Sequence, residues 1–176
     1  MEHYLRELTE AFSTEQRDAL AARQADQDRT VEAVSQLSSA LVAAASGREA
    51  VWRRNAADAL EILDQAVTAE TRARGQADSL LSDIARTQPR LRNRVRGLRL
   101  HYARLSQQIH MALHDLADGD DVGVAETRLH LGSLINDLQL IRGRESDLIY
   151  EAYFDAFNRD VEEELWGGGS ALDHAS

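Results

Sequence analysis

The sequence predicts an all-α protein: an up-down-up-down antiparallel four-helix bundle with a short extra helix between its second and third long helices. Three observations support this fold class. Apolar residues recur at helical spacing along most of the 176 residues, the chain contains a single proline, and short connections separate the periodic segments. Connections this short force neighbouring helices to run antiparallel.

The chain divides into three parts. Residues 1–12 form a short amphipathic arm, and residues 13–161 form the bundle. Residues 162–176 begin with three glutamates and continue with three glycines, so we expect a disordered acidic and glycine-rich tail. No linker or internal repeat divides the bundle further.

The first long helix begins after Ser13, which is expected to form a capping box with Gln16 three residues later. We expect it to end at Gly47, because glycine readily adopts the left-handed conformation that closes a helix. Its predicted inward stripe alternates between spacings of three and four residues. The stripe consists of Leu20, Gln24, Gln27, Val31, Val34, Ser38, Leu41 and Ala45.

The second long helix begins near Arg48 and ends or bends at Gly75. Its inward residues are Trp52, Ala56, Ala59, Leu63, Ala66 and Val67. A short helix with an apolar face follows. Pro89 then suits the first turn of the third long helix, because no N–H is needed there.

The third long helix carries the most regular heptad pattern in the chain. Its inward residues are Leu91, Val95, Leu98, Tyr102, Leu105, Ile109, Ala112 and Leu116. An Asp-Gly-Asp-Asp segment at 118–121 forms a loop. The fourth long helix runs from about Val122 to Val161. Its inward residues are Leu131, Leu134, Leu138, Ile141, Glu145, Leu148 and Ala152.

Polar residues of all four long helices fall at one level of the predicted bundle. At 1.5 Å per residue from the helix ends, they lie within roughly 10 Å of one another along the axis. They are Gln27, Glu70, His101 and Glu145. Arg74 and Arg142 lie close enough to pair with the carboxylates, and buried carboxylates need such partners. We interpret this polar layer as a structural network; a ligand or metal site is the alternative.

The predicted metal ligands are poor for two metals and marginal for one. One histidine and two carboxylates converge, and the neighbouring guanidinium groups repel cations, whereas metal sites in bundles use several histidines and carboxylates from facing helices. We therefore predict no metal and no cofactor. His110 and His114 are spaced like two ligands on one helix face, but Asp115 is the only acidic residue beside them, so we interpret both as surface residues.

Composition excludes several other classes of function. The net charge of −10 argues against nucleic-acid binding, and the absence of cysteine excludes disulfides, thiolate zinc sites and thiol nucleophiles. No apolar run approaches the roughly 20 residues of a membrane span. The first residues lack a signal-peptide profile, so we expect a cytoplasmic protein. All 20 basic residues are arginine, which we attribute to codon bias in a GC-rich, bacterial genome.

Aromatic residues concentrate near the end of the fourth helix, where five of the nine lie between Tyr150 and Trp166. We expect residues 1–12 to cover this end and close the core. The alternative is that the stripe from Tyr150 to Phe157 binds a protein partner or a second copy of the chain, because exposed apolar patches commonly mark interfaces.

Residues 13–160 resemble the hemerythrin-like cation-binding bundles. The segment 89–105, with its histidine at 101, resembles the third helix of that family, and the segment 144–152 resembles part of the fourth helix. Gln27 stands at roughly the ligand position of the first helix.

Most of the metal ligands that the resemblance implies are missing. Glu70 is present, but Ala66 stands where the second helix of the family has its histidine. Leu105 stands where the third helix has a second histidine. Asp147 is present on the fourth helix, but Arg142 replaces the histidine before it. The resemblance therefore implies a degenerate member that has kept the bundle and lost the di-iron chemistry.

We predict a non-enzymatic helical-bundle protein that acts through protein–protein contacts, as an adaptor, regulator or assembly subunit. The alternative is a hemerythrin-like binding or sensor protein that retains a single metal or small ligand at the polar layer. The candidate binding residues are Gln27, Glu70, Arg74, His101, Arg142, Glu145 and Asp147. No catalytic residue is predicted.

Overall fold

The backbone of this computed structural model is described for residues 13–118 and 123–167, and side chains for residues 13–117 and 123–153. Helices account for nearly all of this part of the chain, and it contains no strand. The predicted all-α class is confirmed. The predicted arm at residues 1–12, and its role in covering the aromatic end, lie outside the described residues.

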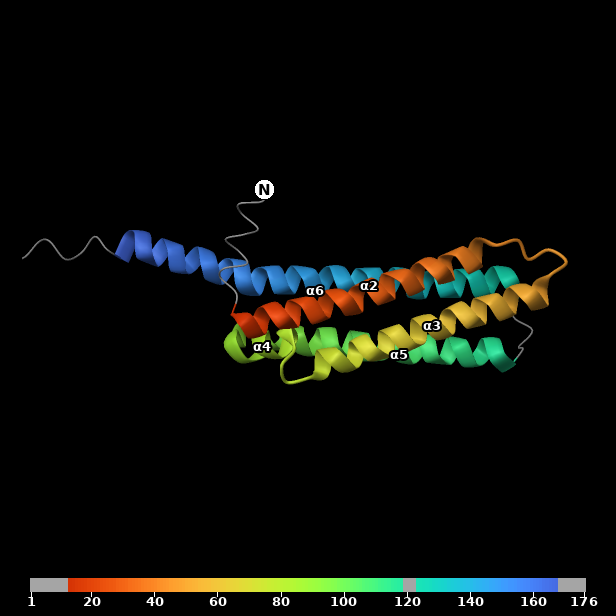
Figure 1. Cartoon of the computed structure of the whole chain (residues 1–176), viewed down its shortest axis with the longest axis horizontal. Helices are drawn as coiled ribbons and strands as arrows, with labels where there is room; N and C mark the ends of the chain where they lie inside the picture. Colours follow the sequence, from red (N-terminus) through yellow and green to blue (C-terminus); the bar gives the residue numbers. More distant parts are fainter. Residues whose placement is uncertain (1–12, 119–122, 168–176) are drawn as a thin grey trace, which may run out of the picture.

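Four long helices and one short helix form a bundle in the described part of the chain (Figure 1). The long helices are α2 (Thr14–Val42), α3 (Glu49–Gly75), α5 (Arg92–Asp118) and α6 (Val124–Gly167). The short helix, α4 (Leu80–Thr87), lies between α3 and α5 in the sequence, as predicted. A 3₁₀ turn, Pro89–Leu91, leads directly into α5, so Pro89 does stand at a helix start.

The helix boundaries follow local hydrogen bonding. At the start of α2 the Gln16 N–H donates to Ser13 Oγ at 3.2 Å, and the Ser13 N–H donates to Gln16 Oε1 at 3.0 Å. This reciprocal pair is the predicted capping box. Helix α3 ends at Gly75, as predicted, and Ser79 caps α4 by accepting the Ser82 N–H at 3.3 Å.

Helix α2 ends at Val42, five residues before the predicted end at Gly47. The chain leaves the helix early because Ala45 turns back into the core, where it is 8% exposed. The Arg48 N–H donates to the Ala45 carbonyl oxygen at 2.8 Å, and Gly47 in that turn has a φ of +70°. Glycine therefore serves the turn into α3, where a side chain would strain the backbone.

Helix α6 continues to Gly167, six residues beyond the predicted end at Val161. Residues 162–167, which were expected to begin a disordered tail, are therefore part of this helix. Glutamate and leucine are good helix formers, and the helix stops only where the run of glycines begins. Figure 1 shows the last part of α6 extending past the end of the bundle formed by α4 and the start of α2.

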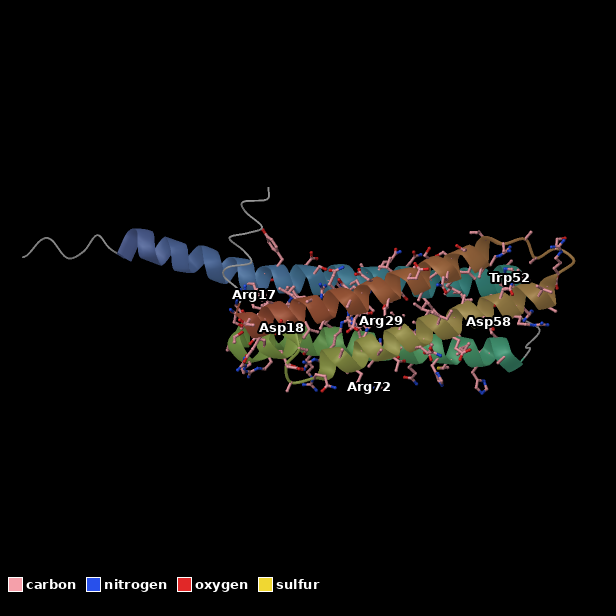
Figure 2. The ribbon with its side chains drawn as sticks, in the orientation of Figure 1. Arg17, Asp18, Arg29, Trp52, Asp58 and Arg72 are labelled. Atoms are coloured by element: carbon pink, nitrogen blue, oxygen red, sulfur yellow. The ribbon has the colours of Figure 1, made fainter. Side chains whose placement is uncertain are left out.

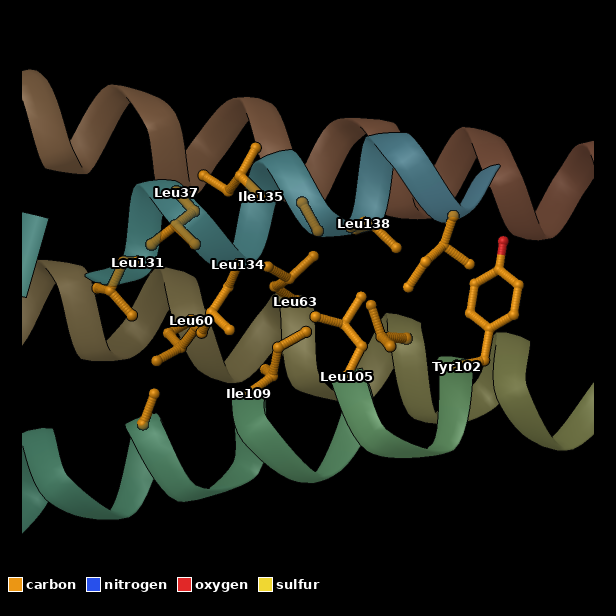
Figure 3. Close-up of a cluster of buried hydrophobic side chains, with 14 of the residues drawn as sticks. Leu37, Leu60, Leu63, Tyr102, Leu105, Ile109, Leu131, Leu134, Ile135 and Leu138 are labelled. Atoms are coloured by element: carbon orange, nitrogen blue, oxygen red, sulfur yellow. The ribbon is translucent and has the colours of Figure 1, made fainter. Parts of the chain in front are cut away.

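An aliphatic core fills the bundle between the long helices (Figure 3). Leu37, Leu63, Leu105 and Leu138, one from each long helix, are each at most 1% exposed. Every predicted inward residue of α5 and α6 is buried except Leu116, which is half-buried. Tyr102 lies at one end of the row in Figure 3.

The predicted inward stripe of α2 was wrong by about one residue near Val31, whereas its last two members, Leu41 and Ala45, are buried as predicted. Val31 is 57% exposed, whereas Thr30, Ala33 and Leu37 are buried. Helix α2 packs chiefly against α3, and the small side chain of Ala33 permits a closer approach than a valine would. This rotation also turns Thr30 toward Glu70 of α3, which accepts a hydrogen bond from it.

Charged side chains cover the outer faces of α2 and α3 (Figure 2). The labelled examples are Arg17, Asp18, Arg29, Asp58 and Arg72, all exposed. Among the described helices, none has both the length and the apolar composition that crossing a bilayer requires.

Candidate functional site

Two carboxylates and an arginine lie buried beside the aliphatic core. Glu70, Arg74 and Glu145 are 2%, 6% and 1% exposed. On α3, Glu70 and Arg74 continue the inward stripe of Leu63 and Val67 at spacings of three and four residues, so both point into the bundle. Glu145 occupies the equivalent inward position on α6.

Arg74 bridges the two carboxylates. Its Nε and Nη2 donate to Glu145 Oε1 at 3.0 Å and to Glu145 Oε2 at 2.8 Å. Its Nη2 also donates to Glu70 Oε1 at 2.7 Å. The planar guanidinium thus forms a two-pronged pair with one carboxylate while holding the other, a geometry that arginine supplies and lysine does not.

Helices α2 and α6 complete the surroundings of Glu70. Arg142 Nη2 donates to Glu70 Oε1 at 3.0 Å and to the backbone carbonyl of Gln27 at 3.1 Å. Thr30 Oγ1 donates to Glu70 Oε2 at 3.0 Å. Both oxygens of this buried carboxylate therefore accept hydrogen bonds, which offsets the cost of removing the charge from water.

Tyr102 is the residue of α5 that contacts these charged side chains. Its hydroxyl donates to Glu145 Oε2 at 2.9 Å, and the Arg74 guanidinium carbon lies 3.8 Å from the centre of its ring. Arg23 of α2 approaches Glu145 Oε1 more loosely, with its Nε at 3.5 Å. We call the set of residues so described the ion-pair layer. It comprises Arg23, Thr30, Glu70, Arg74, Tyr102, Arg142 and Glu145.

The pKa shifts favour the charged forms of Glu70 and Arg74 and the neutral form of Tyr102. Burial alone would raise the pKa of Glu70, but the charges and hydrogen bonds of Arg74 and Arg142 outweigh it and hold that pKa below its usual value. Burial alone would lower the pKa of Arg74, but the hydrogen bond and charge of Glu145 raise it instead. Burial and the Glu145 charge raise the pKa of Tyr102, so its hydroxyl keeps its proton and acts as a donor.

The structure brings together some of the predicted site residues and separates others. Glu70, Arg74, Arg142 and Glu145 meet in the ion-pair layer, and Gln27 joins it only through its backbone carbonyl. The predictions for two residues were wrong. His101 and Asp147 are both exposed and lie outside the layer.

Helix geometry explains both corrections. Successive residues of a helix are turned by about 100°, so the buried Tyr102 directs its neighbour His101 outward. Asp147 lies two residues after Glu145, about 200° around α6, and so faces solvent.

Sequence reasoning missed Arg23, Thr30 and Tyr102 as members of the layer. Tyr102 was placed correctly in the heptad of α5 but treated as apolar, although a buried tyrosine hydroxyl usually requires a polar partner. Arg23 and Thr30 were missed because the inward face of α2 was assigned one residue away.

The donor set does not fit a di-iron centre or a single metal ion. Each of the four oxygens of Glu70 and Glu145 already accepts a contact from an arginine, a threonine or a tyrosine. Three guanidinium groups surround them and repel cations. Within residues 13–117 and 123–153, whose side chains the structure describes, no group of three or more His, Asp or Glu residues is arranged to hold a metal.

Compared with known proteins, the chain matches no family model, no curated protein and no solved structure. The hemerythrin-like resemblance thus rests on the residues quoted for it. Of these, Glu70 points into the bundle, Arg142 pairs with it, and Asp147 faces solvent.

Proposed function

We propose that this chain is a non-enzymatic helical-bundle protein that works through contacts with other proteins, as an adaptor, regulator or assembly subunit. The observation that carries the proposal is the position of Arg74. Its guanidinium fills the space between Glu70 and Glu145, where metal chemistry would need free carboxylate oxygens. We infer that the ion-pair layer holds the helices in register and that the protein acts from its surface.

The projecting part of α6 is the contact element in this proposal. Helix α6 has 44 residues and α2 has 29, a difference of 15 residues. At 1.5 Å per residue this excess extends α6 by roughly 22 Å. Figure 1 draws no other described helix beside the projecting part. An unsupported helix is marginal in water, and laying one face against a partner is a common way to stabilise it.

Tyr150 lies on the outer face of α6, near the end of the bundle. Its side chain is 61% exposed, whereas Ala152 two residues later is 1% exposed. Exposed aromatic residues are enriched at protein interfaces because they offer a large rigid contact area. The partner is then a second protein or a second copy of this chain, bound along the segment from Tyr150 to Phe157.

We further propose that the four long helices run alternately up and down. Between α3 and α5, side chains meet at Asp64–His110 and Thr68–Ser106. Between α2 and α6, contacts join Arg23–Ser146, Gln27–Arg142 and Ala43–Arg128. In both helix pairs the residue numbers rise along one helix as they fall along the other, which supports an antiparallel arrangement.

We also propose that the chain is a degenerate hemerythrin-like bundle. Glu70 has kept an inward position in a polar layer, and Arg74 supplies there the positive charge that a metal would otherwise provide. The proposal accounts for carboxylates in the interior of a bundle whose ligand histidines are missing.

The contact function is tested by sedimentation of the full chain. A variant carrying Tyr150→Ser and Phe157→Ser is compared with wild type. The matched control is Leu129→Ser, at a residue that is 78% exposed near the other end of α6. We expect weak self-association of wild type and control and its loss in the double variant. A monomeric wild type excludes a second copy as the partner, and equal association in all three proteins contradicts the role of this segment.

A further inference from the structure

A cavity of about 230 Å³ lies beside the ion-pair layer, lined by α2, the end of α3, the start of α4 and α6. Its charged inner wall includes Arg23, Glu70, Arg74 and Glu145. Its apolar wall consists of alanines 19, 22 and 73 together with Leu80 and Leu81. The cavity thus pairs a charged wall with an apolar one, as binding sites for small organic molecules do.

Hydrogen bonding in the charged wall is unbalanced toward donors. All four carboxylate oxygens of Glu70 and Glu145 are occupied by donors from the ion-pair layer. By contrast, Arg23 Nε and Arg74 Nη1 in this wall are buried and have no hydrogen-bond partner among the described residues. Buried N–H groups left without acceptors are costly. What this wall lacks is therefore an acceptor.

The charges are unbalanced in the same direction. The ion-pair layer holds three guanidinium groups and two carboxylates, so one positive charge is left over. Asp26 and Asp78 also line the cavity, but Asp26 forms an ion pair with Arg29, and Asp78 is exposed, so water and salt screen its charge. A single negative charge in the cavity would balance the layer, whereas a cation would find neither a free oxygen nor a favourable field.

We propose that this cavity binds a small organic monocarboxylate. Its carboxylate pairs with Arg23, and its short apolar part lies against Leu80, Leu81 and the alanines. Arg23 is the arginine best able to accept a ligand, because its contacts are the longest in the layer: 3.5 Å to Glu145 Oε1 and 3.3 Å to Ser146 Oγ. Its side chain is 18% exposed and so can be reached from solvent. This binding activity goes beyond the protein contacts proposed above and is independent of them.

The test is calorimetric titration of the full chain with sodium butyrate, with butyramide as an uncharged analogue of the same shape. The variant is Arg23→Gln. Its matched control is Arg17→Gln, on the same helix but exposed and outside the cavity lining. We expect saturable binding of one butyrate per chain, unchanged by Arg17→Gln. Binding should be at least about tenfold weaker for butyramide and for Arg23→Gln, because each removes one side of a charge-assisted pair.

The apolar wall is tested separately with Ala22→Leu, which fills part of the cavity, and with acetate and propionate. Affinity should rise by roughly fourfold per methylene from acetate to butyrate, and Ala22→Leu should abolish that gain. If Arg23→Gln fails to fold, the measurements with Ala22→Leu and the shorter carboxylates still test whether the cavity binds a monocarboxylate. Equal binding of butyrate and butyramide, butyrate binding unaffected by Arg23→Gln or by Ala22→Leu, or inorganic phosphate binding as tightly as butyrate would overturn the proposal.

Discussion

The aliphatic core and the ion-pair layer fill neighbouring parts of the same bundle by different means. Leu37, Leu63 and Leu138 contribute by removing apolar surface from water, an effect with no preferred direction. Glu70 and Arg74 contribute only if their atoms meet at hydrogen-bonding distance, because each charge is costly to bury alone. Substitutions that change the shape of a core side chain should therefore cost little stability. Substitutions in the ion-pair layer that leave a charge unpaired should cost much more.

The largest effect is expected for Arg74→Met. This change keeps much of the side-chain volume but leaves Glu70 and Glu145 buried without their shared partner. We expect a loss of about 3–5 kcal/mol in the free energy of unfolding, measured by urea denaturation. Arg72→Met, at an exposed neighbour on α3, should change it by less than about 0.5 kcal/mol. Similar losses in the two variants would show that Arg74 contributes no more than a surface residue.

A comparable loss is expected for Glu70→Ala, which removes the carboxylate that Thr30, Arg74 and Arg142 share. The loss should reach about 3–5 kcal/mol, because the arginines remain with one carboxylate fewer. Added iron should restore neither stability nor any absorption band in the variant, and should not bind wild type. Stoichiometric iron with an oxo-bridge band in wild type would overturn the metal-free interpretation.

Acid should weaken the layer by protonating the same carboxylate. The pKa of Glu70 in the folded protein lies below its usual 4.5, so its contribution is present above 4.5 and is lost as pH falls through the lower, folded pKa. Urea denaturation of wild type and Glu70→Gln, from neutral pH to well below 4.5, isolates the contribution of the Glu70 charge to the free energy of unfolding. Their difference in unfolding free energy should shrink in acid. A difference that stays constant with pH would mean that Glu70 is not charged in the folded protein.

A smaller effect is expected for Tyr102→Phe. The ring and its stacking on Arg74 remain, and only the hydroxyl that donates to Glu145 is lost. Because the acceptor is charged, we expect a loss of about 1.5–3 kcal/mol in unfolding free energy. Tyr150→Phe, at an exposed tyrosine of α6, is the matched control and should be nearly neutral. Equal effects of the two changes would show that the Tyr102 hydroxyl does not stabilise the ion-pair layer.

The smallest effect among the interior positions is expected for Leu63→Met in the aliphatic core. The change conserves volume, and methionine adapts its shape to the space available, so the loss should stay below about 1.5 kcal/mol. Thermal and urea unfolding should agree on this value. A loss as large as that of Arg74→Met would show that the core is as exacting as the layer, and the contrast between them would fail.

The pattern of apolar residues was enough to assign the inward faces of α5 and α6. Each has one dominant stripe, and neighbours such as Leu100 and Leu140 are too isolated to compete with it. Helix α2 was harder, because apolar residues occupy two adjacent stripes, one through Val31 and one through Leu37. Pattern alone does not choose between stripes about 100° apart. Packing against α3 determines which stripe of α2 faces the core, and it buries Thr30 rather than Val31.

The sequence by itself determined that the interior would contain charges, because Glu70, Arg74 and Glu145 stand on inward stripes and Glu70 and Arg74 are one helical turn apart. Only the tertiary structure decided the remaining partners. The contacts of Arg74 with Glu145 and of Tyr102 with Glu145 join residues 71 and 43 positions apart. They depend on how the helices are rotated and shifted against one another. Helical spacing constrains neighbours one turn apart, whereas rotation between helices is set by the fit of many side chains at once.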